Sequence, residues 1–81
     1  MHFVYILESL RNGKHYTGRT SKSVEARLRE HNGGANKWTR ANRPFKLLHI
    51  EEFDTLAEAA TREKFLKSGA GRKIRDQLVD D

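Results

Sequence analysis

The chain has 81 residues, of which 36% are hydrophobic and 33% charged, so it can form one small core and has no room for a second. Sixteen Lys and Arg against eleven Asp and Glu give a net charge of +5, which favours polyanionic partners such as nucleic acids. The absence of cysteine excludes disulfides, zinc ribbons and thiol catalysis, and the apolar run at 3–7 is too short for a membrane span or a signal-peptide core. We therefore expect a soluble, cytoplasmic protein with one domain over residues 1–81.

The first predicted element is a β-hairpin. Residues 3–7 are apolar on both faces of an extended chain, which indicates a strand that is buried on each side. Residues 15–18 return as its partner, and the Asn-Gly dipeptide at 12–13 strongly favours a two-residue turn between them. In that register Ser9 pairs with Tyr16.

Two tyrosines share one face of this hairpin. Because side chains alternate along a strand, Tyr5 and Tyr16 point to the same side, which is either a core face or a functional surface. The two-residue turn places Tyr5 opposite Thr20, about 13 Å along the ladder from Tyr16 at the usual strand rise. A bulge or a longer loop would bring the two together. Gly18 indicates a bulge, a close backbone approach or the end of the strand.

A helix is predicted next, ending near His31. Ser21 or Ser23 can cap its start, and the Asn-Gly-Gly run at 32–34 favours its end. Its inward stripe, with Arg27 at the edge, contains Val24, Leu28 and His31. A histidine in an apolar stripe leaves two interpretations open, a frayed last turn in solvent or a functional role.

We interpret the following segment, 33–44, as a basic loop that can include one helical turn. We predict that it contacts nucleic acid through Lys37, Trp38, Arg40 and Arg43. A tryptophan among cations can stack on a base or sugar. The alternative is that Trp38 fixes the loop to the core.

Residues 45–53 are predicted to form a third strand. Thr55 with Glu58 then matches a capping box, which predicts the start of a helix. This helix is expected to run to about Ser68 and to end at Gly69. The apolar face of this helix consists of Leu56, Ala59, Ala60 and Leu66. Glu63 projects from the middle of that face.

A carboxylate directed at a core is costly unless it is paired or binds a metal. Glu63 therefore has two interpretations, a metal ligand or an ion pair with Lys67 or Arg27. A last short helix over 72–79 is expected to pack through Ile74 and Leu78. Its cations are expected on the solvated face: Arg72, Lys73 and Arg75.

The two tyrosines, Arg27, His31 and Glu63 together suit phosphodiester hydrolysis. That reaction needs a positioned water, stabilisation of charge on the phosphorus centre and help for the leaving oxygen. A divalent cation on a carboxylate serves the last two needs, and Arg27 suits two-pronged contact with phosphate oxygens. A tyrosine hydroxyl, whose pKa is normally about 10, acts as a base only when a metal or cations perturb it.

The ordered set of motifs resembles the GIY-YIG nucleases, especially their small single-domain bacterial members. The residues that carry the resemblance are Phe3-Val4-Tyr5, Tyr16-Thr17-Gly18, Arg27 with His31, Glu63 and the flanking Arg43-Pro44-Phe45 and Arg62-Glu63-Lys64. It covers nearly the whole chain. It implies an α/β (α+β) fold with a small three-stranded antiparallel sheet flanked by helices.

The resemblance also implies roles for these residues. Tyr16 or Tyr5 would activate or orient water, Glu63 would hold Mg²⁺ (or Mn²⁺), Arg27 would stabilise the transition state, and His31 would orient or relay a proton. The chain departs from the family pattern at Phe3, Val4 and Thr17. It also lacks an asparagine after the glutamate, a role that Lys67 or Ser68 could fill.

The sequence therefore predicts a Mg²⁺-dependent DNA endonuclease, structure-selective or weakly specific, that acts in DNA repair or processing. DNA is expected in preference to RNA. One alternative is a non-catalytic nucleic-acid-binding module of the same fold. Another is a structural adaptor in which Glu63, Arg27 and His31 form a buried polar network. Neither a membrane association nor a particular oligomeric state is predicted.

Overall fold

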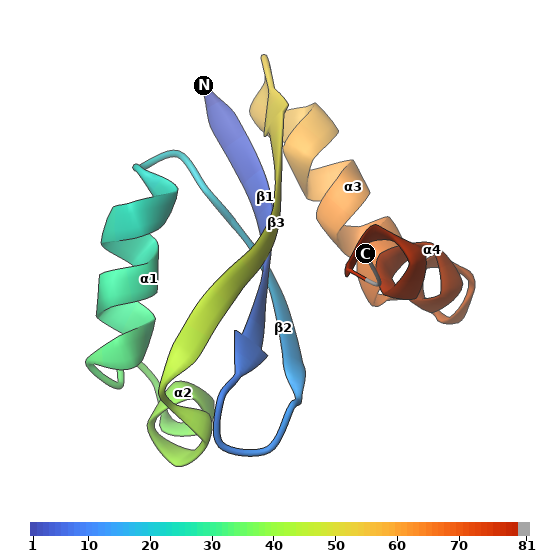
Figure 1. Ribbon diagram of the computed structural model, residues 1–81. Helices are drawn as coiled ribbons and strands as arrows, with labels where there is room; N and C mark the ends of the chain where they lie inside the picture. Colours follow the sequence, from blue (N-terminus) through green and yellow to red (C-terminus); the bar gives the residue numbers. More distant parts are fainter. Residues whose placement is uncertain (80–81) are drawn as a thin grey trace.

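A computed structural model of the chain describes residues 1–79 and consists of one antiparallel sheet with helices on both sides (Figure 1). The elements are β1 (His2–Ser9), β2 (His15–Thr20), α1 (Val24–Asn32), α2 (Lys37–Asn42), β3 (Phe45–Phe53), α3 (Leu56–Lys67) and α4 (Gly69–Val79). The strand order β2-β1-β3 makes β1 the central strand. The predicted fold class, a three-stranded antiparallel sheet flanked by helices, is confirmed.

The central strand β1 is buried on both faces, as its unbroken apolar run predicts. On one face Tyr5 and Leu7 form a cluster with Val24 of α1. On the other face Val4 packs against Ala59 of α3. Two small half-cores, divided by the sheet, therefore hold α1 with α2 on one side and α3 with α4 on the other (Figure 1).

The predicted two-residue turn is wrong. Leu7 lies opposite Tyr16, and the loop extends from Ser9 to Lys14, where the Ser9 amide donates to the Lys14 carbonyl at 2.8 Å. A type I′ turn requires positive φ at both central residues, but in this loop only Gly13 has it, with φ 75°. The Ser9 hydroxyl accepts bonds from two loop amides and donates to the Asn42 carbonyl, and these contacts stabilise the wider loop.

The helix starts follow their caps. The side chain of Ser23 accepts from the third residue of α1, and Thr55 does the same for α3. Phe45–Phe53 forms the third strand as predicted. Leu56, which was expected on the apolar face of α3, is instead 51% exposed because it lies at the open N-terminal end of that helix.

The last helix begins earlier than predicted. Gly69 opens α4, and the break between α3 and α4 falls at Ser68. Gly71 permits this tight junction, since a Cβ there would lie 1.7 Å from the carbonyl oxygen of Phe65. The tight packing also turns Arg75 inward, so its predicted place on the solvated face is wrong: its side chain is only 20% exposed. Over residues 1–79, no helix is both long and apolar enough to cross a membrane.

Candidate active site

A buried hydrogen bond joins the first strand to the first helix. Tyr5 is 1% exposed and His31 0% exposed, and the hydroxyl oxygen of Tyr5 lies 2.9 Å from Nε2 of His31. The second ring nitrogen of His31, Nδ1, has no hydrogen-bond partner among residues 1–79. The interpretation of His31 as a frayed, solvated residue is therefore wrong, because the histidine is part of the core.

Gly18 makes room for the phenol ring of Tyr5. A Cβ at this position would lie 2.6 Å from the Tyr5 hydroxyl oxygen and 2.7 Å from Cζ. Gly18 lies inside β2 and opposite Tyr5 in the ladder, so the ring covers its backbone. Of the three interpretations of this glycine, the close backbone approach is confirmed.

The two tyrosines meet, in contrast to the separation expected from the shorter turn. The ring centroids of Tyr5 and Tyr16 are 6.4 Å apart, and Tyr16 contacts the His31 ring edge-on at 4.8 Å. The longer loop shifts the register by two residues, so the faces stay as predicted while the distance shortens. The three rings form one aromatic cluster between β1, β2 and α1.

Arg27 supplies the positive charge next to this cluster. Its guanidinium pairs with Glu30 one turn along α1 and also lies close to the Tyr5 phenol. Burial raises the pKa of Tyr5, and the nearby Arg27 opposes that shift. Burial, together with the Arg27 charge, lowers the pKa of His31. Both groups of the buried hydrogen bond are consequently neutral at pH 7.

Glu63 lies across the β2 edge from the aromatic cluster and is held by two cations. One oxygen, Oε1, accepts from Nε of Arg19 and the other, Oε2, from Nζ of Lys67, each at 3.0 Å. The predicted pair with Lys67 is confirmed. The pair with Arg27 is wrong because Arg19 takes that place. The negative charge of Glu63 is near enough to Tyr5 to contribute to its raised pKa.

The donor set around Glu63 suits one kind of metal site. Within residues 1–79 there is no group of three or more His, Asp or Glu side chains that could enclose an ion. Mg²⁺ commonly binds one or two carboxylates and completes its shell with water and substrate phosphates. The Glu63 carboxylate, with an 18% exposed side chain, fits that arrangement provided that Arg19 and Lys67 give up their contacts.

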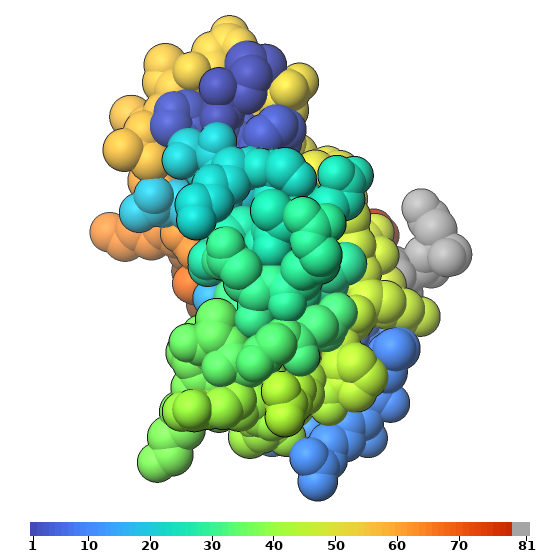
Figure 2. Space-filling model, turned by 90° about the vertical axis from the view of Figure 1, so that its left-hand side faces the viewer, coloured from blue at the N-terminus to red at the C-terminus, as the bar shows by residue number. Residues whose placement is uncertain are grey.

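The residues predicted to contact nucleic acid lie on α2 and next to it. Figure 2 shows this segment beside α1 on the same face of the molecule. Lys37, Arg40 and Arg43 are exposed. Trp38 is stacked on Tyr16 with ring centroids 5.4 Å apart and on Phe45 at 5.7 Å, and it remains 36% exposed. The tryptophan thus fixes α2 to the aromatic cluster and keeps part of its indole in solvent.

Sequence reasoning missed two partners in the site. Arg19 alternates with Gly18 along β2, so its side chain emerges on the α3 side, and the correct register would have placed it near Glu63. Glu30 lies three residues after Arg27, a helical spacing typical of ion pairs, which was a readable signal.

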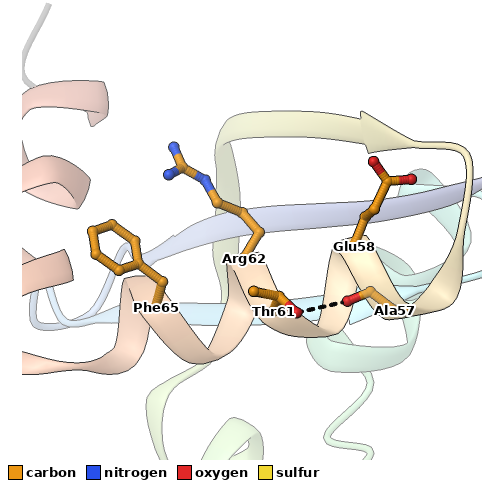
Figure 3. Close-up of a pocket in the computed structure, with 5 residues that line it drawn as sticks. All are labelled: Ala57, Glu58, Thr61, Arg62 and Phe65. Atoms are coloured by element: carbon orange, nitrogen blue, oxygen red, sulfur yellow. Dashed lines mark hydrogen bonds between the residues drawn. The ribbon is translucent and has the colours of Figure 1, made fainter.

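A hollow of about 630 Å³ lies away from the aromatic cluster, on the outer face of α3 (Figure 3). Two of its polar side chains already have partners: Thr61 donates to the Ala57 carbonyl, and Arg62 donates to both oxygens of Glu51 at 2.7 and 3.0 Å. Phe65 lies beneath the Arg62 guanidinium. The Thr61 hydroxyl and the Arg62 guanidinium are therefore already engaged within the protein, and we do not assign the hollow to the substrate.

Comparisons with known proteins agree with the motif analysis. A family model described as the GIY-YIG catalytic domain matches residues 1–75. A UPF0213 protein of Haloquadratum walsbyi is 43% identical over 81 residues, covering 99% of this chain and 88% of that relative. One of Listeria welshimeri is 38% identical over 79 residues, covering 96% and 84%. The solution NMR structure of the UPF0213 protein BH0048 from Bacillus halodurans superimposes with a TM-score of 0.59 and 39% identity, covering 98% of this chain and 82% of that one.

Proposed function

This chain belongs to the GIY-YIG catalytic domain family, and on that premise we propose that it is a metal-dependent endonuclease that hydrolyses phosphodiester bonds in DNA. The observation that supports the proposal is the buried Tyr5–His31 hydrogen bond, with Arg27 beside it and Tyr16 packed against its histidine. A structural core rarely gathers so many titratable groups in one place. Active sites do so regularly.

We assign the two tyrosines different tasks. Tyr5 is 1% exposed, so it acts as a positioning residue that fixes the ring of His31. Tyr16 is partly exposed and lines a cleft, so its hydroxyl is the one that reaches the attacking water. A water held by the Tyr16 hydroxyl in line with the scissile bond needs no covalent enzyme intermediate.

Charge stabilisation falls to Arg27 and Glu63. The Arg27 guanidinium offers a planar pair of donors to two phosphate oxygens, and its side chain is 28% exposed. Glu63 is the residue that would hold Mg²⁺ or Mn²⁺. Such an ion, when bound, acts as a Lewis acid on a phosphate oxygen and favours departure of the leaving oxygen.

The alternative function is a nucleic-acid-binding module without catalysis. Two observations favour it: both oxygens of Glu63 are occupied by cations, and residues 64–81 contain no asparagine to take the place of the family's late amide. This module would share the basic surface and the fold, so binding measurements alone do not separate the two functions.

The deciding experiment incubates purified protein with supercoiled plasmid and with branched, single-stranded and duplex oligonucleotides of DNA and RNA. Mg²⁺, Mn²⁺ or a chelator is present in separate reactions. We expect nicking or cleavage of DNA with metal, and a loss of at least about 10²-fold in Glu63→Gln and in Arg27→Ala. The matched control is Glu52→Gln, which removes the same charge from an exposed position on β3.

Cleavage that persists unchanged in both Glu63→Gln and Arg27→Ala would come from a contaminant and would refute the proposal. Salt-sensitive binding with no cleavage under any metal condition would establish the binding module instead. Equal loss of activity in Glu52→Gln would show a general charge effect rather than a role of Glu63.

A further inference from the structure

The cleft that Tyr16 lines has a volume of about 390 Å³ and extends away from the candidate active site, between β2, α2 and the end of α3 with α4. Figure 1 shows β2 passing between α2 and α4, which come from distant parts of the sequence. The residues that matter for its chemistry are Tyr16, Thr17, Trp38, Lys67, Arg72 and Arg75. No role in catalysis or nucleic-acid binding was predicted for Thr17, Arg72 or Arg75.

Two buried polar groups in this cleft lack a partner. The hydroxyl of Thr17, a residue that is 4% exposed, and Nε of Arg75 make no hydrogen bond within residues 1–79. Within residues 1–79, the acidic group within 4 Å of Arg75 Nε is Asp76 Oδ1, which is 3.9 Å away and beyond hydrogen-bond distance. Buried polar groups rarely lack a hydrogen-bond partner, and a bound ligand is one way to supply it. Nε of Arg75 can only donate and the Thr17 hydroxyl can donate, so a ligand with acceptor atoms would satisfy both.

The positive charge of the cleft restricts further which class of ligand it can bind. Lys67, Arg72 and Arg75 line it, and no Asp or Glu is among its lining residues in the described part of the chain. Arginine forks match phosphate oxygens in geometry as well as charge. Lys67 also contacts Glu63 at 3.0 Å, so the cleft adjoins the carboxylate of the candidate active site. A phosphate in this position would belong to the same strand as a phosphate at that site.

The wall opposite the cations is aromatic. Trp38 lines the cleft with an indole that is 36% exposed, next to Tyr16. An exposed indole next to cations is the combination by which proteins bind unpaired nucleotides, the base against the ring and the phosphate on the cations. A base inside a duplex is stacked between its neighbours and is not free to reach such a wall.

We infer that this cleft binds one unpaired nucleotide of the substrate strand, with its phosphate on Arg72, Arg75 and Thr17 and its base against Trp38. The inference rests on the proposed function and makes it more specific. The substrate is DNA with an unpaired nucleotide next to the cleaved bond, such as a flap, a fork or a single strand. Fully paired duplex leaves the cleft empty.

The sole tryptophan of the chain provides the measurement, because its fluorescence reports directly on the cleft. Thymidine 5′-monophosphate, inorganic phosphate and thymidine are titrated into the full chain with a chelator present, so that no cleavage occurs. We expect saturable quenching by the nucleotide, and affinity at least 10-fold lower for thymidine and for inorganic phosphate. Equal affinity for thymidine would overturn the phosphate contact, and equal affinity for inorganic phosphate would overturn the base contact.

Variants locate the binding. Arg75→Gln and Arg72→Gln should each weaken nucleotide binding at least 10-fold, and Thr17→Val several-fold. Lys73→Gln, which removes the same charge from an exposed position on α4, should stay within 2-fold of the original chain. Equal weakening in Arg72→Gln and Lys73→Gln would show attraction by net charge alone and refute the cleft. Arg72 is exposed, so this comparison stands even if Arg75→Gln fails to fold.

A second measurement keeps this inference separate from the nuclease proposal. Glu63→Gln is titrated with a fluorescent flap oligonucleotide and with the matching duplex, and we expect at least 10-fold tighter binding of the flap. Adding Arg72→Gln should abolish that preference. Cleavage is read from the original chain with metal, and preference from Glu63→Gln. Preference in Glu63→Gln with no cleavage by the original chain would refute the nuclease and keep the cleft, whereas cleavage by the original chain with no preference in Glu63→Gln would keep the nuclease and refute the cleft.

Discussion

Replacing Gly18 by alanine tests whether the backbone of β2 positions Tyr5 for the site. The added Cβ would lie 2.6 Å from the Tyr5 hydroxyl oxygen and 2.7 Å from Cζ, whereas ordinary contacts begin at 3.4 Å. The phenol ring therefore has to move by about 0.8 Å. Tyr5 is 1% exposed and its hydroxyl is held by His31, so the ring has no empty space into which to move.

The size of the expected loss in stability follows from overpacking of the core. An extra methyl group in a packed core costs about 1–3 kcal/mol, and the lower backbone entropy of alanine in the unfolded chain offsets about 0.4–1 kcal/mol of this. We expect a net loss of about 1–2 kcal/mol in the free energy of unfolding. For a domain of this size that lowers the Tm by roughly 4–16 °C. A displacement near 1 Å at the site should also reduce nuclease activity by about 10²-fold.

Urea unfolding followed by circular dichroism measures the first effect, and plasmid nicking the second. The matched control is Gly69→Ala, the same substitution at a position where a Cβ meets nothing within 4 Å. We expect the control to stay within about 0.5 kcal/mol of the original chain. If Gly18→Ala unfolded at the same urea concentration as Gly69→Ala, the packing of Tyr5 on Gly18 would be refuted.

Three further predictions concern single groups. Because burial lowers the pKa of His31 below its ordinary 6.5, the unfolded chain takes up this proton more readily below pH 6.5, so the free energy of unfolding should fall between pH 7.5 and 5.5. The decrease in the free energy of unfolding should be smaller in His31→Gln, and an equal decrease in the two proteins would contradict the role of His31. Ser9→Ala removes the hydroxyl that donates to Asn42 and should cost about 1–3 kcal/mol in urea unfolding, while a loss below about 0.5 kcal/mol would mean that the loop closes without it. Lys67→Met frees one oxygen of Glu63 and should tighten Mn²⁺ binding several-fold in water-proton relaxation, whereas unchanged affinity would place the metal elsewhere.

Local sequence rules were sufficient for most of the fold. The unbroken apolar run of β1 predicted burial on both faces, and the caps Ser23 and Thr55 predicted where two helices begin. The motif set also predicted the family. These features depend on residues a few positions apart, whose spacing fixes which face of an element is apolar and where its backbone groups need a cap.

The tertiary structure alone decided which side chains meet. Ser9 reaches Asn42 across 33 positions and widens the hairpin loop, and the resulting two-residue shift moves β2 by about 7 Å relative to β1. An even shift leaves every side chain on its predicted face, which is why the shared face of the tyrosines was predicted correctly and their separation was not. The same shift sets Arg19 opposite Val4, from where it pairs with Glu63, 44 positions away.

Periodicity assigns a residue to a face, but its partner depends on how separate elements dock. The inward turn of Arg75 shows this most clearly. On its own helix it lies among exposed cations, and only the packing of α4 against α3 brings it into the cleft beside Thr17 and Trp38. The sequence determined the elements and the chemistry available to them. The docking of those elements determined which groups are buried, paired or left free for a substrate.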